Sequence, residues 1–370
     1  MPHPPLILSR FLYCKDEVEL SLVTALLKKE ELEVIYYWAY ELYYSGFDIF
    51  EFMWQIYLDF YYEQHPQFEA YFKKKHDLWK LDKDMKHIAY ILRNMYNLKA
   101  TCTVFMMRQY TCKKDYKDMY PTIMYKLKTK DENILYHNLY QNLLLALERR
   151  HFENICYYLR VLWEENKTNV GLVIGQFLNI IIKEEDTLHY VLAVISKKIY
   201  YQAEENKPVG KHIYVVPKQE QLDHIKQLEE ELIQPIYNTL MFKRFAEIDD
   251  RIGSFTLARG QWLTTEAFIK EMWFHWEYYA MGSPVWLRRL EKFGGTVNHR
   301  QKKIEFATEI GEEGFYDLYA YELDELPKEV QAMSMKPIVK RGGTAWCNYT
   351  FPLNVYEGEE EENELWQWTY

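Results

Sequence analysis

The chain has 370 residues, of which 48% are hydrophobic and 27% are charged, and its formal net charge is −10. This balance is typical of a folded globular protein and excludes general disorder, while the length predicts two packed units or one elongated helical array. Aromatic residues make up 17% of the chain, so we expect many half-buried rings on helix seams and binding surfaces.

The cysteines indicate a reducing compartment. There are five of them, widely spaced and without a CxxC pair: Cys14, Cys102, Cys112, Cys156 and Cys347. An odd number at such spacings predicts neither a disulfide framework nor a zinc site. No signal peptide is expected, because no basic region precedes an apolar stretch at the start. The most apolar run, residues 170–182, is shorter than the about 20 residues of a membrane span, so it predicts a core helix and no membrane partner.

Three helices joined by short turns are predicted near the start of the chain. Asp16 is expected to cap the first helix, whose apolar residues recur with a period near 3.6 and which ends at Lys28-Lys29. The second spans residues 31–45, with Gly46 at the position of a left-handed C-cap, and the third spans residues 48–65. Such a series predicts an antiparallel helical stack.

A similar pattern returns 121 positions later in the chain. The matching positions are Leu22, Ala25, Leu26, Lys28-Lys29 and Tyr36-Tyr37 against Leu143, Ala146, Leu147, Arg149-Arg150 and Tyr157-Tyr158. Further helices are predicted at 170–183 and 187–202. Two interpretations remain open: a diverged helical-hairpin repeat of the solenoid or HEAT-like type, or a chance match between amphipathic hairpins.

A basic stretch lies between the two copies. Residues 99–130 contain eight basic and two acidic residues with interleaved tyrosines. The candidate binding face is Tyr110, Lys113, Lys114, Tyr116, Lys117, Lys126, Lys128 and Lys130. Lysines neutralise phosphates and tyrosines stack on bases, so the stretch is a candidate face for RNA or an acidic partner, but we favour a solvated loop or a docking face for the chain's own acidic tail. Residues 101–107 are expected to be a short strand or a buried segment.

The second half of the chain begins after a predicted break at 204–219, which contains Pro208, Gly210 and Pro217. Helices are expected at 221–250, with a kink at Pro235, and at 265–281. A short helix from Pro284 to Gly294-Gly295 and a hairpin at 296–306 follow. The prediction is thus a mainly α protein with three parts: a repeat-like domain at 1–203, a helical domain with a small hairpin at 218–337, and a tail at 338–370.

The end of the chain is acidic. Residues 309–370 contain 14 acidic and 4 basic residues, so their net charge of −10 equals that of the whole chain. The candidate partner-binding tail is Glu359, Glu360, Glu361, Glu362, Trp366 and Trp368. Charge asymmetry of this kind is typical of an interaction segment, which is expected to dock on residues 99–130, on a neighbouring subunit or on another protein.

The sequence contains no complete motif for catalysis. Gly210-Lys211-His212 lacks the glycine spacing and the Ser/Thr of a phosphate-binding loop, and His275-Trp276-Glu277 has the HxE form of a zinc deaminase without its PCxxC half. The carboxylates of 184–186 and 249–250 are interpreted as solvated helix ends. We therefore expect a protein that is not an enzyme and binds no metal or cofactor.

Several segments resemble an uncharacterised protein family of the nucleocytoplasmic large DNA viruses that infect algae and amoebae. The N-terminal ones are Asp16-Glu17-Val18-Glu19, Trp38-Ala39-Tyr40-Glu41-Leu42-Tyr43-Tyr44-Ser45-Gly46-Phe47, Trp54-Gln55-Ile56-Tyr57 and Asp59-Phe60-Tyr61. The later ones are residues 286–295, 315–321 and Glu325-Leu326-Pro327-Lys328-Glu329-Val330-Gln331. The resemblance implies a viral origin and a location in the virion or in the viral factory of the host cytoplasm, and it assigns no catalytic residues.

Two functions are expected from these observations. The first is a non-enzymatic helical scaffold that joins other viral or host proteins, as a minor structural component of the particle. The alternative is a HEAT-like adaptor, similar in architecture to eukaryotic initiation factor 4G, that binds translation factors or RNA. Residues 37–43 and 157–163 loosely fit a ligand motif for a cap-binding protein, but Leu42 and Leu162 are expected to be core residues.

Overall fold

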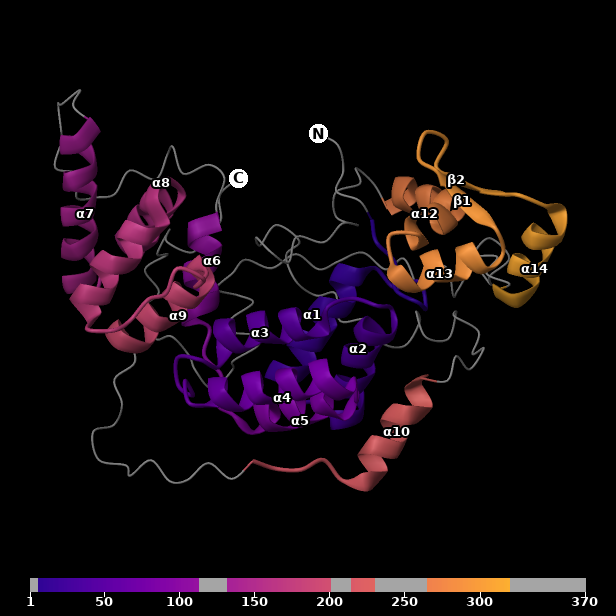
Figure 1. Cartoon of the computed structure of the whole chain (residues 1–370), viewed down its shortest axis with the longest axis horizontal. Coiled ribbons are helices and arrows are strands. Elements are labelled where there is room, and N and C mark those ends of the chain that lie inside the picture. The colour runs from indigo at the N-terminus through magenta and orange to yellow at the C-terminus, as the bar shows by residue number, and fades with distance from the viewer. Residues whose placement is uncertain (1–5, 113–131, 201–213, 230–264, 320–370) are drawn as a thin grey trace. The chain divides into compact units, whose positions relative to one another are not determined.

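The computed structural model describes residues 6–112, 132–200, 214–229 and 265–319, which are mainly helical (Figure 1). The helices are α1 (Lys15–Leu27), α2 (Leu32–Tyr44), α3 (Ile49–Phe60), α4 (Phe68–Asp82), α5 (Lys86–Asn97), α6 (Thr103–Cys112), α7 (Glu132–Glu148), α8 (Phe152–Leu178), α9 (Leu188–Ile199), α10 (Gln219–Glu229), α12 (Thr265–Ala280), α13 (Pro284–Lys292) and α14 (Glu309–Tyr319). The strands β1 (Gly295–Asn298) and β2 (Lys303–Phe306) pair antiparallel, with Gly295 opposite Phe306. The mainly α class and the small hairpin near the C-terminus are confirmed.

Two units of the chain each make most of their contacts internally. Unit 1 contains Met1–Phe52, Lys83–Tyr96 and Val215–Tyr370, and unit 2 contains Met53–Asp82 and Asn97–Tyr214. These are not the domains predicted at 1–203, 218–337 and 338–370, and the last of those lies outside the described residues. Linker composition marks where a chain bends, whereas contacts between distant segments decide which parts share a core. The predicted break at 204–219 does contain the point at which the chain passes from unit 2 to unit 1.

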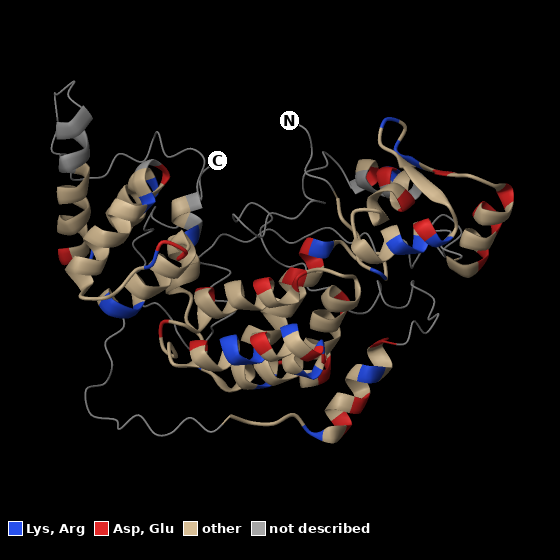
Figure 2. Cartoon of the chain, viewed as in Figure 1, with Lys and Arg blue, Asp and Glu red and all other residues tan. Residues whose placement is uncertain are grey.

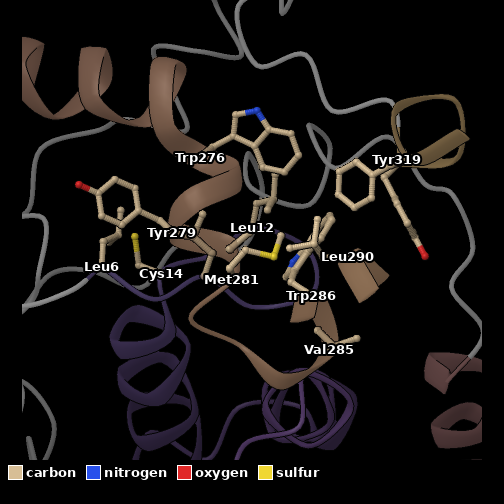
Figure 3. Packing of buried hydrophobic residues seen from close by; sticks show 13 residues of the cluster. Leu6, Leu12, Cys14, Trp276, Tyr279, Met281, Val285, Trp286, Leu290 and Tyr319 are labelled. Atoms are coloured by element: carbon tan, nitrogen blue, oxygen red, sulfur yellow. The ribbon is translucent and has the colours of Figure 1, made fainter. Parts of the chain in front are cut away.

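The core of unit 1 joins the first described residues to the last ones. Figure 3 shows Leu6, Leu12 and Cys14 among the side chains of α12 and α13. The buried cluster consists of Leu6, Leu8, Leu12, Cys14, Trp276, Tyr279, Ala280, Met281, Val285, Trp286, Leu290, Phe315 and Tyr319. Hydrophobic burial of this kind is the main stabilising term in folding, so the N-terminal segment belongs to the same core as α12–α14.

The turn after α2 also contacts the start of α13. Gly46 has φ +88°, as predicted for its left-handed C-cap, and a Cβ atom there would lie 2.8 Å from Cβ of Pro284. The backbone N–H of Val285 donates to the carbonyl of Ser45 at 3.1 Å. Only glycine meets both the conformational and the steric requirement at position 46.

The cap of the first helix lies two residues earlier than predicted. Cys14 is the N-cap of α1, in extended conformation, and its strand-like pairing with Leu8 sets the direction in which the chain enters the helix. Asp16 was expected to be the cap and instead lies in the first turn, where its Oδ1 accepts the N–H of Glu17 at 2.9 Å. A carboxylate in this turn still interacts favourably with the helix dipole.

The hairpins α1–α2 and α7–α8, whose sequences match at an offset of 121, turn in the same way. Lys29 (φ 57°) and Arg150 (φ 55°) occupy equivalent left-handed positions after their helices. The following N–H groups, of Glu30 and His151, donate to the carbonyls of Ala25 (3.0 Å) and Ala146 (2.9 Å), as in a Schellman motif. The first helix of each hairpin therefore ends in the same hydrogen-bonded turn. That the two hairpins belong to one continuous solenoid remains a prediction.

Three helices of unit 2 are tied together by a buried carboxylate. Asp59 of α3 is 2% exposed and accepts Arg108 of α6 through both oxygens, with Nε to Oδ1 at 2.9 Å and Nη2 to Oδ2 at 2.5 Å. His189 of α9 lies with Nε2 2.7 Å from Oδ1. Such bidentate, charge-assisted bonds are strong and directional, so they help to fix how the three helices are oriented.

Two segments of unit 2 differ from their predictions. Residues 103–107 lie in α6, where Val104 and Met107 are fully buried, so the strand alternative is wrong and the buried alternative is confirmed. The apolar run at 170–182 is only partly core, because Leu172 and Ile181 are 57% and 88% exposed. α8 ends at Leu178 since Asn179 adopts a left-handed conformation, which turns the last apolar residues away from the helix.

Candidate anion-binding pocket

Unit 1 contains a hollow of about 310 Å³ with a basic lining. It is lined by Arg10, Tyr44, Glu229, Val285, Arg288, Arg289, Lys292 and Tyr319. Four of these side chains are cationic and one is a carboxylate. Three of the cations come from α13, along which Figure 2 shows blue segments. The hollow is therefore a candidate site for an anionic group.

Arg10 is held rigidly at one side of this basic pocket. Its Nε donates to Oε2 of Glu41 at 2.8 Å, and the two side chains are 3% and 0% exposed. The guanidinium carbon lies 4.4 Å from the ring centroid of Phe11 and 4.8 Å from that of Tyr44. Cation–π contacts with two rings, together with the bond to Glu41, restrict the movement of the guanidinium.

Glu41 compensates the charge of Arg10. Burial raises the pKa of Glu41, while the adjacent Arg10 guanidinium and the N–H of Phe11 oppose that shift by stabilising the carboxylate. Oε1 of Glu41 accepts that N–H at 3.1 Å. Because the pair is buried and bonded, Arg10 contributes shape and polarity to the pocket more than it contributes net charge.

Arg289 is the second buried guanidinium of the pocket. The residue is 6% exposed, and its guanidinium carbon lies 4.4 Å from the ring centroid of Trp286 and 4.8 Å from that of Tyr319. Its Nη1 donates to the carbonyl of Arg10 at 3.2 Å. The rings and this bond fix Arg289 in place before any ligand arrives, which lowers the entropy cost of binding.

Exposed side chains form the rim of the pocket. Arg288 and Lys292 are one helical turn apart on α13, and Glu229 ends α10. Glu291 is also exposed on α13 but is not part of the lining.

Burial raises the pKa of the Tyr44 hydroxyl, the charge of Glu229 adds to that shift, and Arg10 opposes it. Tyr44 therefore presents a neutral ring beside the cations.

The predicted binding face is only partly described. Tyr110 is 8% exposed, its hydroxyl donates to Oε1 of Glu153 at 3.0 Å, and its ring packs edge-on against Phe152. This placement makes Tyr110 a packing residue of unit 2 and leaves its ring covered. The other members lie outside the described residues: Lys113, Lys114, Tyr116, Lys117, Lys126, Lys128 and Lys130. The same holds for the tail residues Glu359, Glu360, Glu361, Glu362, Trp366 and Trp368.

Two weaker motif matches lie in structural positions. Leu42 and Leu162 are 1% and 0% exposed, as expected for core residues and not for a peptide that binds a partner. In the HxE sequence, Trp276 is buried in the core of unit 1, and Nδ1 of His275 lies 3.0 Å from the carbonyl of Lys302. Glu277 accepts the hydroxyl of Tyr316 at 3.3 Å. These contacts account for the HxE residues as parts of the fold.

The residues of the basic pocket escaped sequence reasoning. Arg288-Arg289 and Lys292 stand on a helix that was predicted, and two of them one turn apart are a weak signal for a basic face. Arg10 carries no such signal, because it follows an N-terminal segment with no periodic pattern. Its place in the pocket depends on contacts with residues more than 270 positions away, such as Arg289.

The fold and the pocket define a mainly helical protein with a basic, aromatic-walled hollow. No family model matches the sequence, and no curated protein and no solved structure is significantly similar to it. Within the described ranges, no three His, Cys, Asp or Glu side chains are grouped so that they could hold a metal ion. None of the described helices is long and apolar enough to cross a membrane.

Proposed function

We propose that the chain is a non-enzymatic helical scaffold that joins other macromolecules, and that it holds an acidic segment of a partner protein in the basic pocket of unit 1. The observation that supports this proposal is the lining of the pocket, in which Arg288, Arg289 and Lys292 face a single carboxylate, Glu229. A concentration of like charge in a concave site attracts the opposite charge and orients it.

The physical form of the pocket suits recognition. Arg289 is buried and packs against two aromatic rings, so it acts as a fixed anchor of the kind that dominates binding energy at interfaces. The exposed Arg288 and Lys292 surround it and steer an acidic group towards it. A fixed anchor with a charged rim is the arrangement expected of a docking site on a scaffold.

The resemblance to a family of large DNA viruses indicates the partners. On this proposal they are other viral proteins assembled into the particle, and the protein is a minor structural component found in the virion or at the viral factory. The alternative adaptor for RNA or translation factors depends on residues 99–130, of which residues 113–130 lie outside the described structure.

The test is capture of partners by the tagged full-length chain from infected cells during particle assembly, with nuclease treatment and quantitative mass spectrometry. Three forms are compared: the unchanged chain, the Arg288→Glu/Lys292→Glu variant and the control Arg300→Glu/Lys303→Glu. The control reverses the same two charge types at exposed positions of the hairpin, away from the pocket lining. Capsid proteins should be recovered with the unchanged chain and the control and lost with the pocket variant.

Three other results would count against the proposal. If capsid proteins were recovered equally with all three forms, the partners would not bind through the pocket. Absence of the protein from purified particles would overturn the structural role. Recovery of initiation factors or ribosomal components, in place of capsid proteins, would favour the adaptor alternative.

A further inference from the structure

We infer that the group held in the basic pocket of unit 1 is a phosphate monoester on a protein side chain. This inference rests on the proposed function and specifies its ligand, because an acidic segment presents either carboxylates or phosphates. The charge of the pocket distinguishes between them, and the geometry of its arginines and its size are compatible with a phosphate.

The charge of the lining matches a dianion. Arg10 is compensated by Glu41, at 2.8 Å, so the cations that remain are Arg288, Arg289 and Lys292. Glu229 offsets one of these three, which leaves two positive charges in the lining. A phosphate monoester carries about −1.5 to −2 charges at pH 7, whereas a carboxylate or a phosphodiester carries one. A single carboxylate would leave a positive charge of the site uncompensated.

The geometry favours oxygens arranged in a fork. Arg289 packs against Trp286 and Tyr319, whose rings also contact each other edge-on, and its Nη1 donates to the carbonyl of Arg10. A planar guanidinium binds phosphate and carboxylate oxygens in pairs. Arg288 and Lys292 are exposed on the same helix and also line the pocket. They can therefore donate to a third oxygen of a phosphate.

The size of the hollow exceeds that of a phosphate alone. Its volume of about 310 Å³ corresponds to roughly ten water molecules, of which a phosphate displaces only a few. Tyr44, Tyr319 and Val285 line the remaining space with apolar surface. The pocket therefore accommodates both the phosphate and the stem of the side chain that carries it.

The first experiment measures binding of small probes to the full-length chain by ³¹P NMR and calorimetry. The probes are N-acetyl-O-phosphoserine amide, N-acetylglutamate amide, dimethyl phosphate and inorganic phosphate. We expect the phosphoserine derivative to bind at least about tenfold more tightly than the glutamate derivative and dimethyl phosphate. Its affinity should fall below about pH 6, where a phosphate monoester loses its second charge.

Variants locate the binding. Arg288→Ala/Lys292→Ala removes two rim cations without touching the core, and we expect it to weaken binding of the phosphoserine derivative by at least about tenfold. The control Arg300→Ala/Lys303→Ala should bind as the unchanged chain does. Arg289→Lys keeps the charge but removes the fork, so it should also weaken binding; circular dichroism confirms that each variant is folded.

The outcomes separate this inference from the proposed function. Equal affinity for the glutamate and phosphoserine derivatives overturns the phosphate inference and leaves an acidic-segment scaffold standing. If dimethyl phosphate binds more tightly than the phosphoserine derivative, the ligand is a phosphodiester of nucleic acid or lipid. If inorganic phosphate binds as tightly as the phosphoserine derivative, the ligand is a free ion. Either result overturns the phosphate-monoester inference. If phosphoserine binds as expected and no partner is captured from cells, the scaffold role fails while the chemistry of the pocket stands. Phosphatase treatment of the captured partner should release it only if both are right.

Discussion

The indole Nε1 of Trp286 donates a hydrogen bond to the carbonyl of Ser9 at 2.9 Å, across 277 positions of the sequence. Both residues are fully buried, so this bond joins the N-terminal segment to α13 inside the core of unit 1. Arg289, one turn later on the same helix, makes the neighbouring bond to the carbonyl of Arg10. The basic pocket thus depends on the docking of the first described residues.

Trp286→Phe should destabilise unit 1. The change removes the only donor of the side chain, leaves the Ser9 carbonyl buried without this bond and creates a small void, so we expect a loss of about 2–4 kcal/mol in the free energy of unfolding. Urea unfolding followed by circular dichroism measures this loss. Trp54→Phe, at a half-buried position, is the control and should cost clearly less. Equal effects would mean that the bond to Ser9 contributes little.

Gly46→Ala should be more costly than Gly294→Ala. Both glycines have positive φ, of 88° and 70°, so each alanine loses about 1–2 kcal/mol through its backbone conformation. At Gly46 the new Cβ would also lie 2.8 Å from Cβ of Pro284, whereas at Gly294 the nearest atom is 3.8 Å away, on Ala307. The crowding should add about 1–3 kcal/mol at Gly46 alone. Thermal and urea unfolding of the two variants test the difference; equal stabilities would show that the contact with Pro284 relaxes freely.

The carboxylate of Asp59 should make the stability of unit 2 sensitive to acid. Burial raises its pKa, but Arg108 and His189 together lower it from 3.8 to about 2. Because the folded-state pKa lies below the unfolded one, the stabilisation is complete above about pH 4 and is lost as the pH falls towards 2. This shift in the pKa of Asp59 corresponds to a contribution of about 2 kcal/mol to the free energy of unfolding. Urea unfolding between pH 7 and pH 2.5 measures it.

Asp59→Asn tests the same group by substitution. It should lower the free energy of unfolding at pH 7 by about 3–5 kcal/mol, since Arg108 is then left in a buried site without its carboxylate. The loss of stability between pH 4 and pH 2.5 should become shallower in the variant. Asp77→Asn is the control, because the side chain of Asp77 is 70% exposed in its pair with Lys80. An unchanged acid response in Asp59→Asn would assign that response to other carboxyl groups.

Arg150→Gly should stabilise the protein. Arg150 has φ 55° in the turn between α7 and α8, a conformation that glycine adopts without the steric cost paid by other residues. We expect a gain of about 0.5–1 kcal/mol after the larger entropy of glycine in the unfolded chain is included. Arg149→Gly is the control and should destabilise, because the N–H of Arg149 still bonds to the carbonyl of Leu145 as in a helix. A loss of stability in Arg150→Gly would contradict the proposed strain.

The sequence by itself determined the local features of this protein. The spacing of apolar residues predicted the helices at 31–45 and 265–281, and the positions of Gly46 and Gly294 predicted how two helices end. Such features depend on backbone geometry and on neighbours three or four positions away, so they can be recognised without knowing the rest of the fold.

Only the tertiary structure decided which distant segments meet. Nothing near Ser9 indicates Trp286, and nothing near Asp59 indicates Arg108 and His189, because each contact is selected by complementary shape and charge after the chain has folded back on itself. The same reason explains why Tyr110 looked like a binding residue in a basic stretch and is in fact buried. It also explains the basic pocket: a shared core brings the guanidinium of Arg289 to the backbone carbonyl of Arg10, and no local pattern encodes that contact.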